Sequence, residues 1–186
     1  MRITKAILVT WLLLLSGMTA VAQQPGTEWQ SRLAHILPLL GHRNWIMIVD
    51  SAYPLQSSSG VETIETNTDQ MEVIRWVLHA IDSSIHVRPI VFMDAELPYV
   101  PEKDAPGVTA YRAGIKTALA GQKITSLPHE QIIAKVDEVG KRFHVVVLKT
   151  TMTVPYTSVF LQLNCKYWSD DAEAQMRKAM GGGTAK

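Results

Sequence analysis

Residues 40–50 read LGHRNWIMIVD, and this stretch decides the fold class. Its continuous apolar run, residues 45–49, is typical of a strand buried on both faces of a parallel sheet. A glycine turn with His42 precedes the run, and Asp50 ends it. A histidine exchanges protons near neutral pH, and the carboxyl end of a strand is where open α/β sheets bind ligands. A turn histidine and a helix-capping aspartate explain these residues equally well.

The first 22 residues have the features of a secretory signal peptide. Two basic residues precede an apolar run over residues 6–15, and the sequence AVA at residues 20–22 offers a cleavage site before Gln23. A membrane span needs about 20 apolar residues, so this shorter run favours a cleaved signal over an anchor. We therefore expect a periplasmic or secreted protein, with no membrane attachment after cleavage.

The rest of the chain, residues 23–186, is long enough for one domain with a core. The first 22 residues hold two of the 18 basic residues and none of the 17 acidic residues, which leaves a formal net charge of −1 with neutral histidines. This balance does not favour nucleic acid or an anionic membrane as a partner. The single cysteine, Cys165, allows no intramolecular disulfide and lies in an apolar-rich run, so we expect a buried thiol.

Hydrophobic periodicity predicts that helices and strands alternate along this part of the chain. Helices are expected over residues 27–40, 69–82, 108–120, 128–139 and 169–180, and strands over residues 45–49, 87–93, 143–148 and 159–163. Asn67 or Thr68 is the expected N-cap of the second helix. Such alternation indicates an α/β fold. We predict one three-layer sandwich over residues 27–180 with a largely parallel central sheet, a C-terminal helix over residues 169–180, and a flexible tail from residue 181.

Three polar clusters lie at boundaries of these elements, where side chains converge on clefts. They are His42 with Asp50, the sequence PHEQ at residues 128–131, and the sequence PYTS at residues 155–158. His129 falls in the first turn of its helix, where a solvated histidine is the simpler explanation.

Other polar residues offer less. Asp94 and Glu96 fall where a strand passes into a loop, and we expect both to be solvated. No serine has the G-x-S-x-G setting of a hydrolase nucleophile. The sequence also lacks a recognisable metal-ligand cluster or Gly-rich phosphate loop.

Together the three clusters resemble the motifs of the D-ribose pyranase and L-fucose mutarotase family. The sequence LGHRNWIMIVDSAYP at residues 40–54 is similar to the amino-terminal motif, in which an aspartate follows eight residues after the histidine. LPHEQ at residues 127–131 is similar to the family's second histidine site, and PYTSV at residues 155–159 to its P-Y-x-N-[IV] motif. The similarity extends over about residues 27–164, and the motifs occur in the same order.

The resemblance implies a cofactor-free isomerase, without metal or nucleotide, that interconverts ring forms or anomers of a monosaccharide. It implies that His42 is the general acid and that Asp50 orients the substrate. The remaining residues of the implied sugar pocket are His129, Tyr156, Thr157 and Ser158. A histidine suits the proton transfers of hemiacetal opening. The resemblance also implies a ring-like homo-oligomer with sites near subunit contacts.

Two departures from the family pattern leave a second function open. Ser158 stands where the family usually has asparagine, which removes an amide that can bind a sugar hydroxyl. Family members are usually cytoplasmic, whereas this chain has a signal-like start. The alternative is a non-catalytic exported module that binds a sugar or a protein on the same scaffold.

Overall fold

The structure is a computed structural model that describes residues 27–181. The predicted signal peptide, residues 1–22, and all but the first residue of the predicted tail lie outside this range. Among the described residues, no helix has the length and apolar character needed to cross a membrane.

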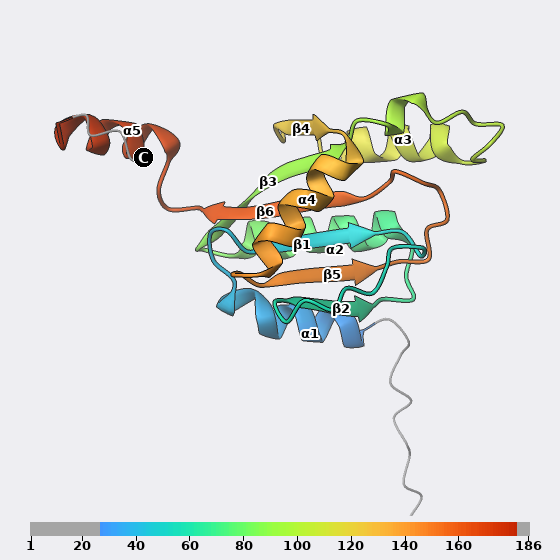
Figure 1. Cartoon of the computed structure of the whole chain (residues 1–186), viewed down its shortest axis with the longest axis horizontal. Coiled ribbons are helices and arrows are strands. Elements are labelled where there is room, and N and C mark those ends of the chain that lie inside the picture. The colour runs from blue at the N-terminus through green and yellow to red at the C-terminus, as the bar shows by residue number, and fades with distance from the viewer. Residues whose placement is uncertain (1–26, 182–186) are drawn as a thin grey trace, which may run out of the picture.

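A six-stranded sheet forms the centre of the fold, with the strand order β2-β5-β1-β6-β3-β4 (Figure 1). In chain order the strands are β1 (Trp45–Val49), β2 (Val61–Glu65), β3 (Val87–Asp94), β4 (Ile124–Leu127), β5 (Val145–Lys149) and β6 (Val159–Cys165). Five strands run in one direction, and β6 is antiparallel to both of its neighbours. The predicted α/β class with a largely parallel sheet is confirmed.

Helices cover both faces of the sheet, which gives three layers (Figure 1). On one face lie α1 (Glu28–Ile36), α2 (Gln70–Ser83) and α3 (Val108–Ala118), and on the other lies α4 (His129–Gly140). Two short 3-10 helices, η1 (Leu37–Leu39) and η2 (Leu97–Tyr99), follow α1 and β3. The predicted helix over residues 27–40 is therefore divided near Pro38, whose ring is unfavourable inside an α-helix.

The strand β1 shows how one apolar run serves two cores. Ile46 and Ile48 contribute to the larger core beneath α1, α2 and α3, whereas Trp45, Met47 and Val49 contribute to the smaller core beneath α4. All five side chains are buried. Successive side chains of a strand point to opposite faces, so a strand covered on both faces has no polar position, as the sequence predicts.

Some local features differ from the sequence prediction. The strands β2 and β4 were not expected, because both are edge strands whose side chains are mostly half-buried or exposed. The N-cap of α2 is Asp69, whose carboxylate accepts hydrogen bonds from the backbone N–H groups of Met71 and Glu72, rather than Asn67 or Thr68. Cys165 is half-buried, because it lies at the end of β6.

The helix α5 (Asp170–Ala179) extends away from the sheet (Figure 1). Its N-cap is Ser169, whose hydroxyl accepts a hydrogen bond from the backbone N–H of Ala172 at 3.0 Å. An ion pair of 2.9 Å between Arg88 and Asp170 joins its first turn to β3. The helix has no buried residue. Helical structure is therefore present where the sequence predicts the C-terminal helix, but it lies outside the core.

Gly60 allows the segment before β2 to approach the end of α4 closely. A Cβ atom at Gly60 would overlap the carbonyl oxygen of Gly140 and lie 2.8 Å from that of Phe143. Because both are backbone atoms, relief requires a backbone shift. We expect Gly60→Ala to lower the free energy of unfolding by about 1–3 kcal/mol, measured by urea denaturation.

Gly114, inside α3, offers a matched control for this substitution. A Cβ atom there would lie 3.5 Å from Cε of Met71, which is an ordinary contact. Alanine is favoured over glycine in a helix by about 0.5–1 kcal/mol, so Gly114→Ala should be neutral or stabilising. An equal loss of stability in both variants would contradict the close approach at Gly60.

Candidate functional site

A cleft of about 480 Å³ lies where three segments meet: the loop after β1, the start of α4 and the loop before β6. The parallel pairing of β1 with β5 brings their carboxyl ends to one edge of the sheet, and the antiparallel β6 begins at that edge. This is the edge at which open α/β sheets usually bind ligands. The topology therefore favours the cleft as the functional site.

One predicted residue from each sequence motif lines this cleft: Asp50, His129 and Tyr156. The rings of His129 and Tyr156 meet edge to face, with centroids 5.8 Å apart and planes at 82°. The carboxylate of Asp50 accepts a hydrogen bond from the backbone N–H of Ala52 at 2.8 Å, which orders the loop after β1. The fold thus brings Asp50 together with side chains that lie 79 and 106 residues later in the sequence.

Tyr156 adopts an unusual backbone conformation at the rim of the cleft. Its φ angle is 58°, in the left-handed region, which costs a non-glycine residue about 1–3 kcal/mol. The next residue fixes the turn from behind, because the carbonyl oxygen of Thr157 accepts hydrogen bonds from Nε2 of Gln70 at 2.6 Å and from the hydroxyl of Tyr111 at 2.5 Å. These contacts from α2 and α3 hold the strained tyrosine in place.

Thr157 and Ser158 belong to the packed interior. They are 0% and 1% exposed, and neither lines the cleft. The hydroxyl of Thr157 donates a hydrogen bond to the carbonyl oxygen of Val154 at 2.8 Å, which closes the turn below Tyr156. In the single chain these residues support the rim, and their direct contact with a sugar stays a prediction.

His42 lies at the opposite end of β1 from the cleft. It is exposed in the turn that precedes the strand, whereas Asp50 follows the strand. The five residues of β1 span about 16 Å at about 3.3 Å per residue. His42 therefore does not reach the cleft of its own chain.

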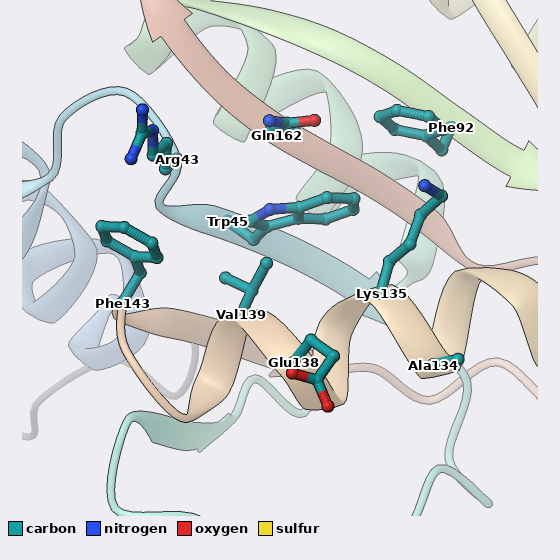
Figure 2. Close-up of a pocket in the computed structure, with 9 residues that line it drawn as sticks. All are labelled: Arg43, Trp45, Phe92, Ala134, Lys135, Glu138, Val139, Phe143 and Gln162. Carbon is teal, nitrogen blue, oxygen red and sulfur yellow. The ribbon is translucent and has the colours of Figure 1, made fainter. Parts of the chain in front are cut away.

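A second hollow, of about 550 Å³, lies beside α4 at this amino end of β1 (Figure 2). Trp45 stacks on Phe92 with ring centroids 5.3 Å apart, and the guanidinium group of Arg43 lies 5.7 Å from the ring centroid of Phe143. Charged side chains of α4 and the amide of Gln162 border these rings. The lining of this hollow includes no histidine, whereas His129 lines the cleft. The hollow is therefore less suited to proton transfer near neutral pH.

Two carboxylates that the sequence assigns to a solvated loop contribute to the site. The Asp94 side chain is 0% exposed, and its Oδ1 lies 3.1 Å from Nδ1 of His129. Both carboxylate oxygens of Glu96 accept the backbone N–H of His129, at 3.0 and 3.1 Å. The expectation of solvation is wrong for Asp94 because β3 continues to this residue, which pairs with Leu127 just before α4. The sequence does contain one indication of this role, because Asp94 follows directly after a predicted strand, as Asp50 does.

The Asp94 carboxyl group has an unusual environment. Burial raises its pKa to about 6, although the hydrogen bond and charge of His129 favour the ionised form, while the negative charges of Glu96 and Asp50 raise the pKa further. Its Oδ2 is buried without a hydrogen-bond partner among the described residues. The Asp94 carboxyl group can therefore gain or lose a proton near pH 6, in contact with the imidazole ring of His129.

Tyr53 is a further residue of the cleft that the sequence analysis did not single out. Burial, with the charges of Asp137, Asp50 and Asp94, raises the pKa of its hydroxyl to about 12. The hydroxyl accepts a hydrogen bond from Nε2 of Gln56 at 2.9 Å. It therefore stays protonated at neutral pH and remains a hydrogen-bond donor.

The raised pKa of Asp94 predicts a pH-dependent cost in stability. The folded protein binds this proton more tightly than the unfolded chain, so the contribution to the free energy of unfolding is full below about pH 4 and falls as the pH rises to about 6. Asp94→Asn cannot ionise. As the pH rises from 4 to 7.5, we expect the free energy of unfolding of this variant to increase by about 1–3 kcal/mol relative to that of the parent. Urea denaturation at both pH values measures this difference.

Asp82 provides the matched control, because its side chain is 91% exposed. Asp82→Asn should show no such pH-dependent gain. A difference between Asp94→Asn and the parent that stays constant over this pH range would contradict the raised pKa.

Comparison with solved structures finds chains that are similar to this one. The structure of Bacillus subtilis RbsD complexed with D-ribose is 20% identical in sequence, with a TM-score of 0.51, over 72% of this chain and 92% of that chain. The fucose mutarotase in complex with L-fucose from Streptococcus pneumoniae is also 20% identical, with a TM-score of 0.48, over 72% of this chain and 91% of that chain. No curated protein matches the chain.

Comparison with protein families gives a match over most of the chain. The sequence pattern of the RbsD / FucU transport protein family matches residues 29–165, a range that contains all three motifs and the whole sheet. The match ends before α5. It confirms the resemblance to the ribose pyranases and fucose mutarotases, and the chain therefore belongs to the RbsD / FucU transport protein family.

Proposed function

We propose that this protein is a cofactor-free isomerase that interconverts ring forms or anomers of a monosaccharide. The observation that carries the proposal is the cleft in which Asp50, His129 and Tyr156 meet. Family membership supports it, as does the D-ribose in the structure of Bacillus subtilis RbsD, which shares the fold. The cleft volume of about 480 Å³ lies within the range of about 300–1,000 Å³ that is usual for small-molecule sites.

The side chains of the cleft suit the chemistry of hemiacetal opening. The reaction needs one proton delivered to the ring oxygen and another removed from the anomeric hydroxyl. Histidine is the side chain that exchanges protons most readily near neutral pH. Asp50 can accept hydrogen bonds from sugar hydroxyls, and Tyr156 and Tyr53 can donate and accept them. These groups would orient the sugar while the histidines transfer protons.

His42 fits this scheme as the general acid if it comes from a neighbouring subunit. It is exposed in the turn before β1, and in its own chain the buried strand separates it from Asp50. We propose a ring-like homo-oligomer in which the turn carrying His42 lies against the cleft of the next copy. A heterologous contact closes into a ring when the rotation between neighbouring copies divides a full turn evenly, and each site would then combine residues of two subunits.

Exchange between sugar ring forms tests the proposed activity directly. We expect the parent protein to accelerate the exchange of ribose, fucose or a related sugar, followed by saturation-transfer NMR. His42→Ala should lose about 10²-fold or more, because a positioned acid or base contributes about 10²–10⁴-fold. His35→Ala, which removes an exposed histidine of α1, should exchange the sugar as fast as the parent. Calorimetric binding without faster exchange would instead support the non-catalytic module.

Mixed oligomers test the shared site. In assemblies formed from equal amounts of His42→Ala and His129→Ala, a composite site regains both histidines in about a quarter of random pairings. We therefore expect about a quarter of the parent activity, although each variant alone is inactive. Activity that stays at the level of the single variants, or a monomer in light scattering at micromolar concentration, would contradict the composite site.

Export forms a further part of the proposal. Cleavage before Gln23 would release the mature chain into the periplasm or outside the cell. Amino-terminal sequencing of the protein from its native host should give Gln23 as the first residue. A cytoplasmic chain that begins at Met1 would contradict this localisation.

A further inference from the structure

We infer that Asp94 is a positioning residue that keeps the ring proton of His129 on Nδ1 and thereby makes Nε2 the proton acceptor of the cleft. The inference rests on the proposed function and deepens it. It assigns His129 as the base that removes the proton of the anomeric hydroxyl, opposite the acid His42. The inference is based on the contact between the buried carboxylate of Asp94 and Nδ1 of His129.

The contact with Asp94 determines which nitrogen of His129 carries the proton. Oδ1 of Asp94 lies 3.1 Å from Nδ1. An ionised carboxylate can only accept a hydrogen bond, so Nδ1 must donate, and Nε2 of the neutral ring then carries a lone pair. No hydrogen bond involves Nε2 within residues 27–181, and the ring lines the cleft with the side chain 30% exposed. A ligand hydroxyl can therefore approach Nε2.

Three contacts fix His129 as a unit. Glu96 binds its backbone N–H, Asp94 binds the ring nitrogen, and Tyr156 lies edge to face against the ring. A solvated histidine at a helix start needs no fully buried carboxylate behind its ring. Oδ2 of Asp94 has no hydrogen-bond partner among residues 27–181. An unmet buried polar atom costs stability, and a purely structural role leaves that cost unexplained.

The surroundings of Asp94 predict how pH affects the base. Burial raises the pKa of this carboxyl group to about 6, so it loses its charge in acid and then donates a proton to Nδ1 instead of accepting one. The exchange rate should therefore fall as the pH drops through about 6. The other titratable or charged groups that face Asp94 or share a cavity with it are Glu96, Asp50, Tyr53, Tyr111, Arg112 and Lys116.

NMR of the histidine ring tests the tautomer without a sugar. Two-bond ¹H–¹⁵N correlations at pH 7.5 should show His129 with its proton on Nδ1 in the full-length parent. In Asp94→Asn the amide can donate as well as accept, so we expect the proton on Nε2 or a mixture of both tautomers. Glu96→Gln is the matched control, because this side chain contacts the backbone of His129 rather than its ring, and it should leave the tautomer unchanged.

Sugar exchange measures the consequence for catalysis. At saturating sugar we expect Asp94→Asn to lose about tenfold to hundredfold in rate with little change in KM, and to lose the acid limb of the pH profile near 6. Asp94→Glu should restore part of the rate. A parent ring with its proton on Nε2, or an Asp94→Asn variant with unchanged tautomer and rate, would overturn the inference. If the parent accelerates no exchange but the tautomers behave as expected, the positioning by Asp94 stands and the proposed function fails.

Discussion

The antiparallel insertion of β6 between β1 and β3 is the constraint on which the fold and its cleft depend. It joins the parallel strands β2, β5 and β1 to the parallel pair β3 and β4. Because β6 runs against its neighbours, its first residues lie at their carboxyl ends. The turn with Tyr156 therefore lies beside the loop after β1 and the start of α4. The direction of β6 thus places the third motif next to the other two.

The chemistry of the cleft depends on a carboxylate that the fold holds at a cost. Water is excluded from Asp94, which favours its protonated form, while His129 favours the ionised form. The balance places the proton affinity of the carboxyl group near that of an ordinary imidazole. Tyr156 adds a strained backbone at the same place. Sites that bind or transform ligands commonly concentrate such local penalties, and the two cores of the sheet provide the compensating stability.

The sequence predicts those parts of the molecule in which a local pattern matches burial. Residues 45–49 are wholly apolar because both faces of β1 are covered, and the helices that carry apolar stripes lie close to their predicted ranges. The edge strands β2 and β4 escape prediction, because partial exposure leaves them without a clear apolar pattern. The motifs correctly indicate that Asp50, His129 and Tyr156 belong near one another. The burial of Asp94 depends instead on how α4 lies against β3. Its place after a predicted strand indicates a position at the edge of the sheet, but not that the side chain is buried.

Because α5 lies outside the core, its local stability should be lower than that of the sheet. A ten-residue helix is shorter than the about 12–15 residues at which isolated helices become marginally stable in water, and this one buries no side chain. Its amide hydrogens should therefore exchange with solvent through local opening, whereas those of β1 and β6 require disruption of the whole sheet. The helix α5 can thus fray, bend or be replaced without disturbing the two cores.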